Sequence, residues 1–284
     1  MTTLASTPVR PVIGRLAAAG TLPYVAIKSA WLTGHPIGVP DPGMLEGTSM
    51  TVLNAVTVLL DACVVALALA LTHPWGRRLP VVALLLPAWV GTGLLLPVGI
   101  SFVPALWLAF GGGPVGGLDG WVRPLVYGGF AWQAVFLVIA LWTHVRDRWE
   151  LRGAVPAGFG PLARALAGGG TVLALVSAVL QLGSGISGGG AQILVGTVNA
   201  ALAVAGAVGV VTLLRGGGRA AAVAAWLGSG AMFSWGLYTT ALTMGGTVMA
   251  AGTTPASGLA ALTGLLAGFA LAPAGLLALT PPTP

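Results

Sequence analysis

The sequence predicts an all-α fold, a polytopic membrane bundle of about eight transmembrane helices arranged as two parallel four-helix repeats. Three observations lead to this prediction. Only 6% of the 284 residues are charged and 56% are hydrophobic, whereas about 25% of a soluble domain is charged. Apolar runs recur that reach the roughly 20 residues a helix needs to cross the hydrocarbon layer. Arginines border these runs at alternate ends, as expected of a chain that crosses a membrane repeatedly.

Eight apolar runs are long enough to cross a bilayer. They are residues 12–34, 48–72, 79–100, 122–144, 164–184, 191–214, 220–244 and 257–279. The third run continues to residue 110 and is rich in proline. A ninth helix there would place an arginine-bearing loop on the wrong side of the membrane. We therefore interpret residues 101–118 as an outer extension or a re-entrant segment, which neighbouring helices must shield from lipid.

Cationic residues mark one side of the predicted bundle. They precede the first run and follow the second, fourth and sixth runs: Arg10, Arg15, Arg77, Arg78, Arg146, Arg148, Arg152, Arg215 and Arg219. The opposite loops carry Asp41, Glu46 and Asp119, with Arg123 as their cation. Under the positive-inside rule the arginine-rich segments are cytoplasmic. We expect a multi-pass protein of the cell membrane with both termini in the cytoplasm, its first run retained rather than cleaved as a signal peptide.

Composition and motifs argue against several function classes. The net charge of +6 comes from residues beside the spans, so the expected partner is the lipid bilayer rather than a nucleic acid. The single cysteine, Cys63, excludes an intramolecular disulfide and a cysteine-based metal cluster. His35, His73 and His144 all lie at span ends, and the chain has no P-loop, HExxH or CxxC motif. We expect no cofactor, no metal site and no catalytic residue.

An internal repeat divides the chain into residues 1–150 and 151–284. Three segments recur in the same order, with offsets of 150, 145 and 137 residues: Leu16-Ala17 and Gly20-Thr21 match Leu166-Ala167 and Gly170-Thr171, residues 51–55 match 196–200, and residues 88–93 match 225–230. Each half has four spans, so the halves are parallel rather than inverted. Parallel repeats place a substrate pathway at their interface in known transporters. The alternative is that duplication only builds a stable bundle.

The segment Leu22–Leu32, with the sequence LPYVAIKSAWL, resembles multi-pass membrane proteins of GC-rich actinobacteria. The preference of this chain for arginine over lysine, and its many alanines and glycines, agree with a GC-rich genome. That group is uncharacterised, so the resemblance implies a membrane location and no particular activity.

Two ionisable residues, Lys28 and Asp61, lie within the predicted spans and are the first candidates for a functional site, because a charge at the centre of a bilayer is costly. Helical spacing places each on a polar face. The faces are Thr21, Tyr24, Lys28, Trp31 and His35 on the first span, and Thr51, Asn54, Thr57 and Asp61 on the second. We expect these two faces to lie against each other. The candidates for further polar groups that face them are Gln133 on the fourth span and Gln181 on the fifth, or Ser234, Tyr238 and Thr239 on the seventh. A helix-packing hydrogen bond is the commoner role of such side chains. The counterparts of Lys28 and Asp61 in the second repeat are Ala178 and Gly206, so the candidate ligand-binding residues are Lys28, Asp61, Asn54, Tyr24, Trp31 and Gln133.

Depth in the membrane argues against an ion pair between Lys28 and Asp61. At 1.5 Å per residue their levels differ by about 10 Å. Lys28 is better placed beside Asn54, or reaching outward to Asp41 or Glu46. The alternative is that it extends to the outer interface, with Tyr24 and Trp31 as interfacial aromatics. Asp61 lies near mid-membrane, where it is neutral and hydrogen-bonded or ionised beside water or a cation.

These observations favour a small secondary transporter or permease-like protein for a small-molecule substrate, with a polar site in the first half. Two alternatives remain open. One is a non-catalytic membrane subunit or scaffold for a membrane protein partner or a second copy, since residues 264–268 form a small-xxx-small pattern that suits close helix contact. The other is an intramembrane enzyme acting on a lipid or prenyl substrate, which ranks last because no second catalytic group lies at the depth of Asp61.

Overall fold

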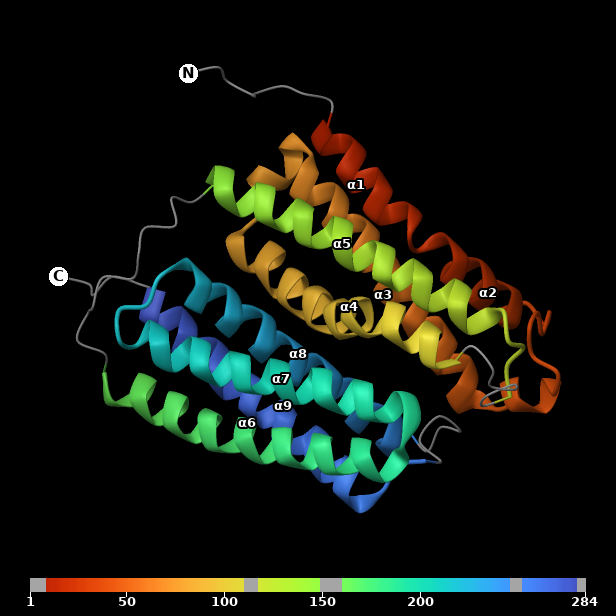
Figure 1. The fold of residues 1–284 in the computed structure, drawn as a ribbon. Coiled ribbons are helices and arrows are strands. Elements are labelled where there is room, and N and C mark those ends of the chain that lie inside the picture. Colours follow the sequence, from red (N-terminus) through yellow and green to blue (C-terminus); the bar gives the residue numbers. More distant parts are fainter. Residues whose placement is uncertain (1–8, 110–116, 149–159, 246–251, 280–284) are drawn as a thin grey trace. The chain divides into compact units, whose positions relative to one another are not determined.

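The computed structural model describes residues 9–109, 117–148, 160–245 and 252–279, and these residues are almost entirely helical (Figure 1). The α-helices are α1 Val9–Ala19, α2 Leu22–Leu32, α3 Thr48–Thr72, α4 Val81–Ala109, α5 Val122–Arg148, α6 Pro161–Gly188, α7 Gly190–Leu213, α8 Arg219–Met244 and α9 Pro255–Leu279. Two short 3-10 helices, η1 Pro42–Leu45 and η2 Pro74–Arg78, lie in the loops on either side of α3. The described residues contain no strand, in agreement with the predicted all-α class.

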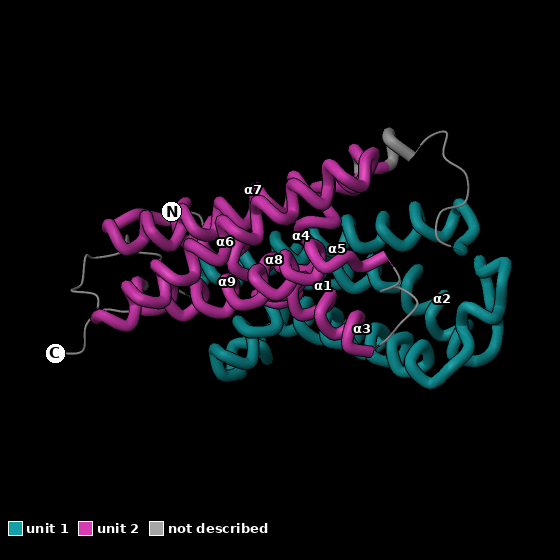
Figure 2. Tube along the Cα trace, turned by 90° about the horizontal axis from the view of Figure 1, so that it is seen from below, with its two compact units in different colours: residues 1–88, 111–150 teal, residues 89–110, 151–284 magenta. Residues whose placement is uncertain are grey.

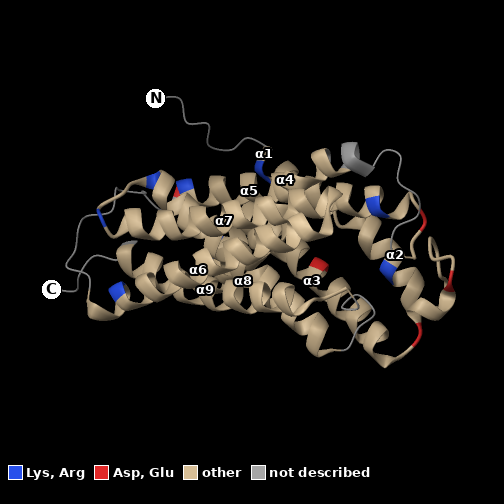
Figure 3. Cartoon of the chain, turned by 60° about the horizontal axis from the view of Figure 1, so that its bottom comes forward, with Lys and Arg blue, Asp and Glu red and all other residues tan. Residues whose placement is uncertain are grey.

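Seven of these helices, α3 to α9, are long and apolar enough to cross a membrane. Large apolar side chains are exposed along them: Val82, Val179 and Phe269 each expose 67–70% of their surface. Such side chains suit a lipid environment and are costly in water. Figure 3 shows the complementary pattern, because charged residues gather near the helix ends and are sparse along the helices. These features are those of a multi-pass membrane protein.

The first predicted span is not a single helix. It consists of α1 and α2, each 11 residues long, which are separated at Gly20 and Thr21. Pro23 has no backbone N–H to donate to the carbonyl of Ala19, and glycine is a poor helix former, so the helical ladder is interrupted here. Neither piece reaches the roughly 20 residues that a span needs. The first of the eight predicted spans is therefore divided into two short helices, and the predicted count of eight stays a prediction.

The stretch after the third span is helical rather than re-entrant as far as it is described. α4 runs without a break from Val81 to Ala109, so residues 101–109 extend the helix. Its 29 residues correspond to about 43 Å at 1.5 Å per residue, longer than the roughly 30 Å of hydrocarbon in a bilayer. The rest of the predicted segment, residues 110–116, lies outside the described residues, as does Arg152.

The chain forms two compact units, shown in different colours in Figure 2. Unit 1 comprises Met1–Ala88 and Gly111–Glu150, and unit 2 comprises Trp89–Phe110 and Leu151–Pro284. This division assigns most of α4 to unit 2. The two units are defined by which residues pack together, so they do not test the predicted repeat boundary at residue 150, which stays a prediction.

In unit 1, α1 and α2 together take the place of one long helix. Both pack against α3 and α5, which also contact each other. Gly14 in α1 lies beside Thr72 at the end of α3, and Arg10 forms an ion pair with Asp147 at the end of α5. α1 and α2 therefore run antiparallel to both α3 and α5, and α3 and α5 run parallel to each other.

In unit 2, helices α6, α7, α8 and α9 form a ring in which each packs against the next and α9 returns to α6. The core is rich in alanine, for example Ala174, Ala203 and Ala274, so the helices approach closely. Gly268 of the small-xxx-small pattern lies against α8, where an added Cβ would come 2.5 Å from the Ser229 carbonyl oxygen. The close contact that this pattern predicts is thus made within the chain.

Candidate functional site

The two polar faces predicted on the first and second spans meet in unit 1 through a buried hydrogen bond. Lys28 Nζ on α2 donates to Asn54 Oδ1 on α3 at 2.7 Å, and each of these residues is 2% exposed. The interpretation that places Lys28 beside Asn54 is confirmed. The alternative in which Lys28 reaches outward to the interface is wrong for this conformation, because the side chain is enclosed.

Two aromatic rings enclose the Lys28 ammonium. Nζ lies 4.3 Å from the ring centroid of Trp31 and 5.3 Å from that of Tyr24, both within the range of cation–π attraction. Helical spacing produces this arrangement, since positions i−4 and i+3 share a face with Lys28. The Trp31 indole is held by a 2.9 Å hydrogen bond from Nε1 to the carbonyl oxygen of Ile37. The Lys28 amino group is therefore held between aromatic and amide neighbours.

Asp61 lies buried on α3, and the described part of the chain gives it no charged partner. Its side chain is 5% exposed, and Oδ2 has no hydrogen-bond partner among the described residues. The described residues contain no ion pair between Asp61 and Lys28, as the difference in depth leads one to expect. A buried ionised carboxylate without a partner is strongly unfavourable, so Asp61 requires a bound proton or a cation.

Gln133 is the second buried polar side chain without a partner in unit 1. It is 0% exposed, and neither Oε1 nor Nε2 has a hydrogen-bond partner within the described part of the chain. Its Cγ lies 2.7 Å from the position that a Cβ on Gly20 would occupy. The Gln133 side chain thus lies against the interruption between α1 and α2. Orphaned buried amides are rare in folded proteins and call for an explanation.

Asp61, Gln133 and the interruption lie at one level of unit 1. His144 Nδ1 on α5 lies 3.0 Å from the Leu71 carbonyl oxygen on α3. Gln133 precedes His144 by 11 residues and Asp61 precedes Leu71 by 10, so on parallel helices their heights differ by about 2 Å.

The same counting relates Asp61 to the interruption. Asp61 follows Asn54 by seven residues and Thr21 precedes Lys28 by seven. Because α2 and α3 are antiparallel and joined by Lys28 and Asn54, Thr21 and Asp61 have nearly equal heights. An acid, an amide and an interrupted helix therefore converge on one level.

The interruption adds backbone polar groups to this level. Thr21 Oγ1 and the Thr21 N–H both donate to the Ala18 carbonyl oxygen, at 2.8 and 3.1 Å. Helix ends leave carbonyl and N–H groups without partners inside the helix. In discontinuous transporter helices such groups coordinate ions and substrates. Chemically, this level can hold a proton or a small cation.

Two members of the predicted polar faces lie away from the site. α2 ends at Leu32, so His35 falls in the following loop, where it is exposed and its Nδ1 lies 3.3 Å from Thr33 Oγ1. Thr51 is exposed near the start of α3. The structure thus brings together Lys28, Asn54, Tyr24 and Trp31 at one level, and Asp61 and Gln133 at another.

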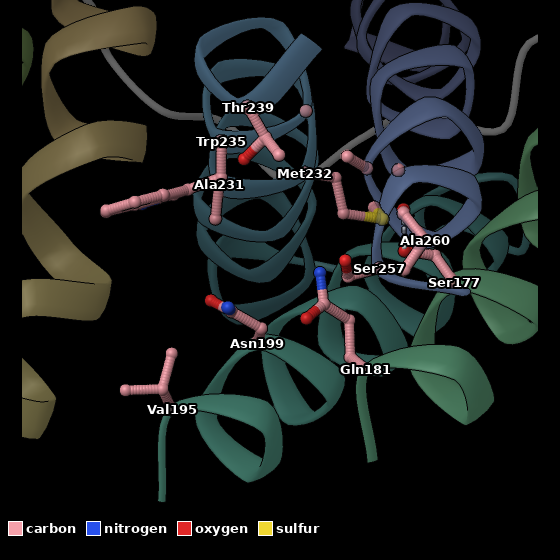
Figure 4. A pocket seen from close by; sticks show the side chains of 13 residues that line it. Ser177, Gln181, Val195, Asn199, Ala231, Met232, Trp235, Thr239, Ser257 and Ala260 are labelled. Atoms are coloured by element: carbon pink, nitrogen blue, oxygen red, sulfur yellow. Dashed lines mark hydrogen bonds between the residues drawn. The ribbon is translucent and has the colours of Figure 1, made fainter. Parts of the chain in front are cut away.

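Unit 2 contains a cavity whose lining includes Gln181 and Thr239, two of the polar groups named from the sequence (Figure 4). Its volume is about 210 Å³, and 13 residues from α6, α7, α8 and α9 line it, none of them charged. Gln181 and Asn199 extend into it from α6 and α7, with Thr239 on α8 (Figure 4). Asn199, the counterpart of Asn54 in the predicted repeat, was not predicted from the sequence to face a site.

A reciprocal contact joins α4 to α8 within unit 2. Trp89 Nε1 on α4 donates to Ser229 Oγ on α8 at 3.1 Å, and Trp226 Nε1 on α8 donates to Thr92 Oγ1 on α4 at 3.2 Å. Gly93 lies directly against Gly230 between them. Trp89 and Trp226, Thr92 and Ser229, and Gly93 and Gly230 are each separated by 137 residues, the offset of the third repeat match. Trp89 therefore donates to Ser229, the repeat counterpart of Thr92, and Trp226 donates to Thr92, the repeat counterpart of Ser229.

No protein-family model, curated protein or solved structure matches the chain. A proposal about function therefore rests on the geometry of the two units.

Proposed function

We propose that the protein is a small secondary transporter of the cell membrane, driven by a proton or a monovalent cation bound at Asp61. The observation that carries this proposal is the convergence of two buried polar side chains, Asp61 and Gln133, on the interruption between α1 and α2, because neither has a partner among the described residues. Intramembrane ionisable groups mark ion pathways and proton relays. Discontinuous helices supply ion sites in known transporters.

Asp61 serves as the cation-binding group in this proposal. In the loaded form a proton on the carboxyl group, or a cation beside the carboxylate, neutralises the buried charge. In the empty form the ionised carboxylate must gain water, which requires the packing around α1 and α2 to open. Loading and conformation are then linked, because the ion stabilises one state more than the other. Gln133 offers both an amide oxygen and an amide N–H at the same level.

Lys28 contributes a fixed positive charge about 10 Å from this level. One of its three N–H donors is used by Asn54. The buried ammonium, held by Tyr24 and Trp31, favours a nearby hydrogen-bond acceptor over a second cation. In this proposal Lys28 therefore makes the region next to Asp61 more favourable for a substrate that accepts hydrogen bonds than for a cation.

We further propose the layout of two parallel four-helix repeats, residues 1–150 and 151–284, with both termini in the cytoplasm. The reciprocal contact of Trp89 and Trp226 supports it, since a two-fold relation between α4 and α8 produces matching contacts in both directions. The pairs 89–229 and 94–235 follow the same direction along both helices, as parallel repeats require. Arg77 and Arg78 at one end of unit 1, with Asp41 and Glu46 at the other, support the orientation.

The first test of the proposal is ion-driven accumulation in proteoliposomes. A panel of radiolabelled small solutes is offered under an imposed pH or Na⁺ gradient to the wild type, Asp61→Asn, Lys28→Ala and the control Glu46→Gln, which removes an exposed carboxylate outside the helices. We expect Asp61→Asn to abolish gradient-driven accumulation and Glu46→Gln to retain it. Unchanged accumulation in correctly inserted Asp61→Asn and Lys28→Ala would refute the proposal.

A second test needs no substrate. The infrared carbonyl band of a protonated carboxyl group is recorded while the pH or the Na⁺ concentration is changed. We expect a band that responds to proton or Na⁺ concentration in the wild type and is missing in Asp61→Asn. A spectrum identical in both proteins would rule out ion binding at Asp61.

The scaffold alternative would instead be favoured by a stoichiometric partner that copurifies from the native host.

A further inference from the structure

We infer that the cavity of unit 2 is a binding site for a small uncharged solute rich in hydrogen-bonding groups, such as an amide or a polyol. The site is separate from the level of Asp61 and consists of residues from α6, α7, α8 and α9. Its ligand class follows from the chemistry of the lining, the size of the cavity and the absence of charge among the residues that line it.

Two side-chain amides in the cavity have unused hydrogen-bonding capacity. Gln181 and Asn199 are half-buried, and neither side chain makes a hydrogen bond to the described residues. Each amide offers an acceptor oxygen and an N–H₂ donor group. Both residues line the cavity, Gln181 from α6 and Asn199 from α7 (Figure 4). Polar groups that face a cavity without partners in the protein are available to a ligand or to water.

Hydroxyl groups and one aromatic ring complete the lining. Thr239 on α8 and Ser257 at the beginning of α9 line the cavity, and the Ser257 hydroxyl already bonds to Thr254. Trp235 is fixed by a 3.2 Å hydrogen bond from Nε1 to the Leu94 carbonyl oxygen, and it adds an apolar wall. A few placed polar groups on an otherwise apolar surface are typical of small-molecule sites. The hydroxyl and amide groups together suit a ligand with several donors and acceptors.

Size and charge narrow the ligand further. A volume of about 210 Å³ lies below the roughly 300–1,000 Å³ of drug-sized sites, so the ligand is small. No Asp, Glu, Lys, Arg or His lines the cavity. An ionic ligand would lose its hydration without gaining a counter-charge, which is unfavourable in an apolar setting. An uncharged ligand exchanges its water contacts for amide and hydroxyl contacts at little cost.

The proposed repeat explains why the cavity exists. Asn199 is the counterpart of Asn54, and Ala178 that of Lys28, by the repeat offsets. In unit 1 the Lys28 side chain occupies the space beside the asparagine. In unit 2 an alanine stands in its place, and Gln181 replaces the indole of Trp31. This explanation of the cavity depends on the proposed repeat, whereas the ligand class follows from the lining residues alone.

The experiment uses single cysteines in the full-length Cys63→Ser protein, because Cys63 is the chain's one cysteine. Asn199→Cys places a thiol in the cavity, and Val208→Cys on the same helix, at a position 57% exposed, is the control outside it. Both are labelled with the small reagent 2-aminoethyl methanethiosulfonate. We expect Asn199→Cys to react at least tenfold faster if water fills the cavity. Equal rates for the two thiols would overturn the inference.

Ligand class is tested by protection from labelling at Thr239→Cys, which keeps both amides. Acetamide and acetate are nearly identical in size and differ in charge, so they form a matched pair at neutral pH. We expect acetamide and glycerol to slow the labelling severalfold and acetate to have no effect. Protection by acetate as strong as that by acetamide, or no protection by any uncharged probe, would contradict the inference.

Two further arms complete the design. Monoolein carries a glycerol headgroup, so protection by monoolein but not by free glycerol identifies a lipid as the source of the same uncharged chemistry. Gln181→Leu in the Thr239→Cys protein removes one amide, and we expect acetamide protection to require about tenfold more probe. An unchanged concentration would exclude Gln181 from the site. Labelling needs no transport, so it succeeds or fails independently of the role of Asp61.

Discussion

Lys28 on α2 and Asn54 on α3 form a buried hydrogen bond of 2.7 Å that joins two neighbouring helices of unit 1. The pair fixes the register between α2 and α3, and this register places Asp61 level with the interruption at Gly20 and Thr21. The position of the proposed ion site therefore depends on a contact about 10 Å away from it.

A double-mutant cycle tests the contribution of Lys28 and Asn54 to stability. Asn54→Leu leaves the buried ammonium without its acceptor, and we expect a loss of about 1.5–3 kcal/mol, the range for hydrogen bonds to charged groups. Lys28→Met together with Asn54→Leu removes both partners, and most of the loss should be recovered. Thermal unfolding in detergent measures each variant. Additive losses in the double variant would show that the two side chains do not stabilise each other.

Asp61→Asn should preserve or increase stability while it abolishes ion-driven function. Asp61 makes no hydrogen bond or ion pair to the described residues, so the substitution removes no stabilising contact, and the amide cannot ionise. Functional residues often reduce stability in this way. Unfolding temperatures of wild type and Asp61→Asn are compared across a range of pH. A fall of several degrees for Asp61→Asn would point to a structural role instead.

Gly20→Ala should destabilise unit 1 by about 1–3 kcal/mol. The new Cβ would lie 2.9 Å from the Gly129 carbonyl oxygen and 2.7 Å from Gln133 Cγ, so α5 would have to move away. Gly168→Ala on α6 is the matched control, because nothing lies within 4 Å of its added Cβ. There alanine should stabilise the helix by about 0.5–1 kcal/mol. Equal effects of the two substitutions would argue against close packing at Gly20.

Thr92→Val and Ser229→Ala should weaken unit 2 by similar amounts, about 1 kcal/mol each. Each removes the acceptor of one tryptophan N–H, Trp226 in the first case and Trp89 in the second. Chemical unfolding followed by tryptophan fluorescence measures both losses. If only one variant is destabilised, the two contacts are not equivalent and the two-fold relation between α4 and α8 loses its support.

Membrane orientation is tested with Glu46→Cys and Arg78→Cys in the Cys63→Ser background. Glu46 lies in the acidic loop before α3, and Arg78 lies in the arginine-rich loop after it. Under the proposed topology a membrane-impermeant thiol reagent should label Glu46→Cys in intact cells, and Arg78→Cys only after permeabilisation. The reverse pattern would place the termini outside.

Much of the architecture was predictable because it follows from local rules. Apolar run length indicated the helices that can cross a membrane, and the spacing of Lys28 and Asn54 on their helices predicted that they meet. Pro23 carried the signal for the interrupted first span, but its effect depends on whether neighbouring helices can satisfy the freed backbone groups. The prolines within α4 do not interrupt their helix, which continues past them to Ala109. A proline in the sequence therefore does not by itself show where a helix is interrupted.

The sequence by itself determined the all-α class, the apolar helices and the polar faces, because each depends on periodicity and length along one segment. The tertiary structure alone decided that Asp61 and Gln133 share a level with no partner among the described residues, and that Gln181 and Asn199 line a cavity. Those relations depend on the heights at which separate helices pack and on how much side-chain volume fills the space between them. Neither the packing height of a helix nor the volume left between helices is encoded in a single segment. For this reason only the tertiary structure showed that Asp61 and Gln133 lie at the level where the first predicted span is interrupted.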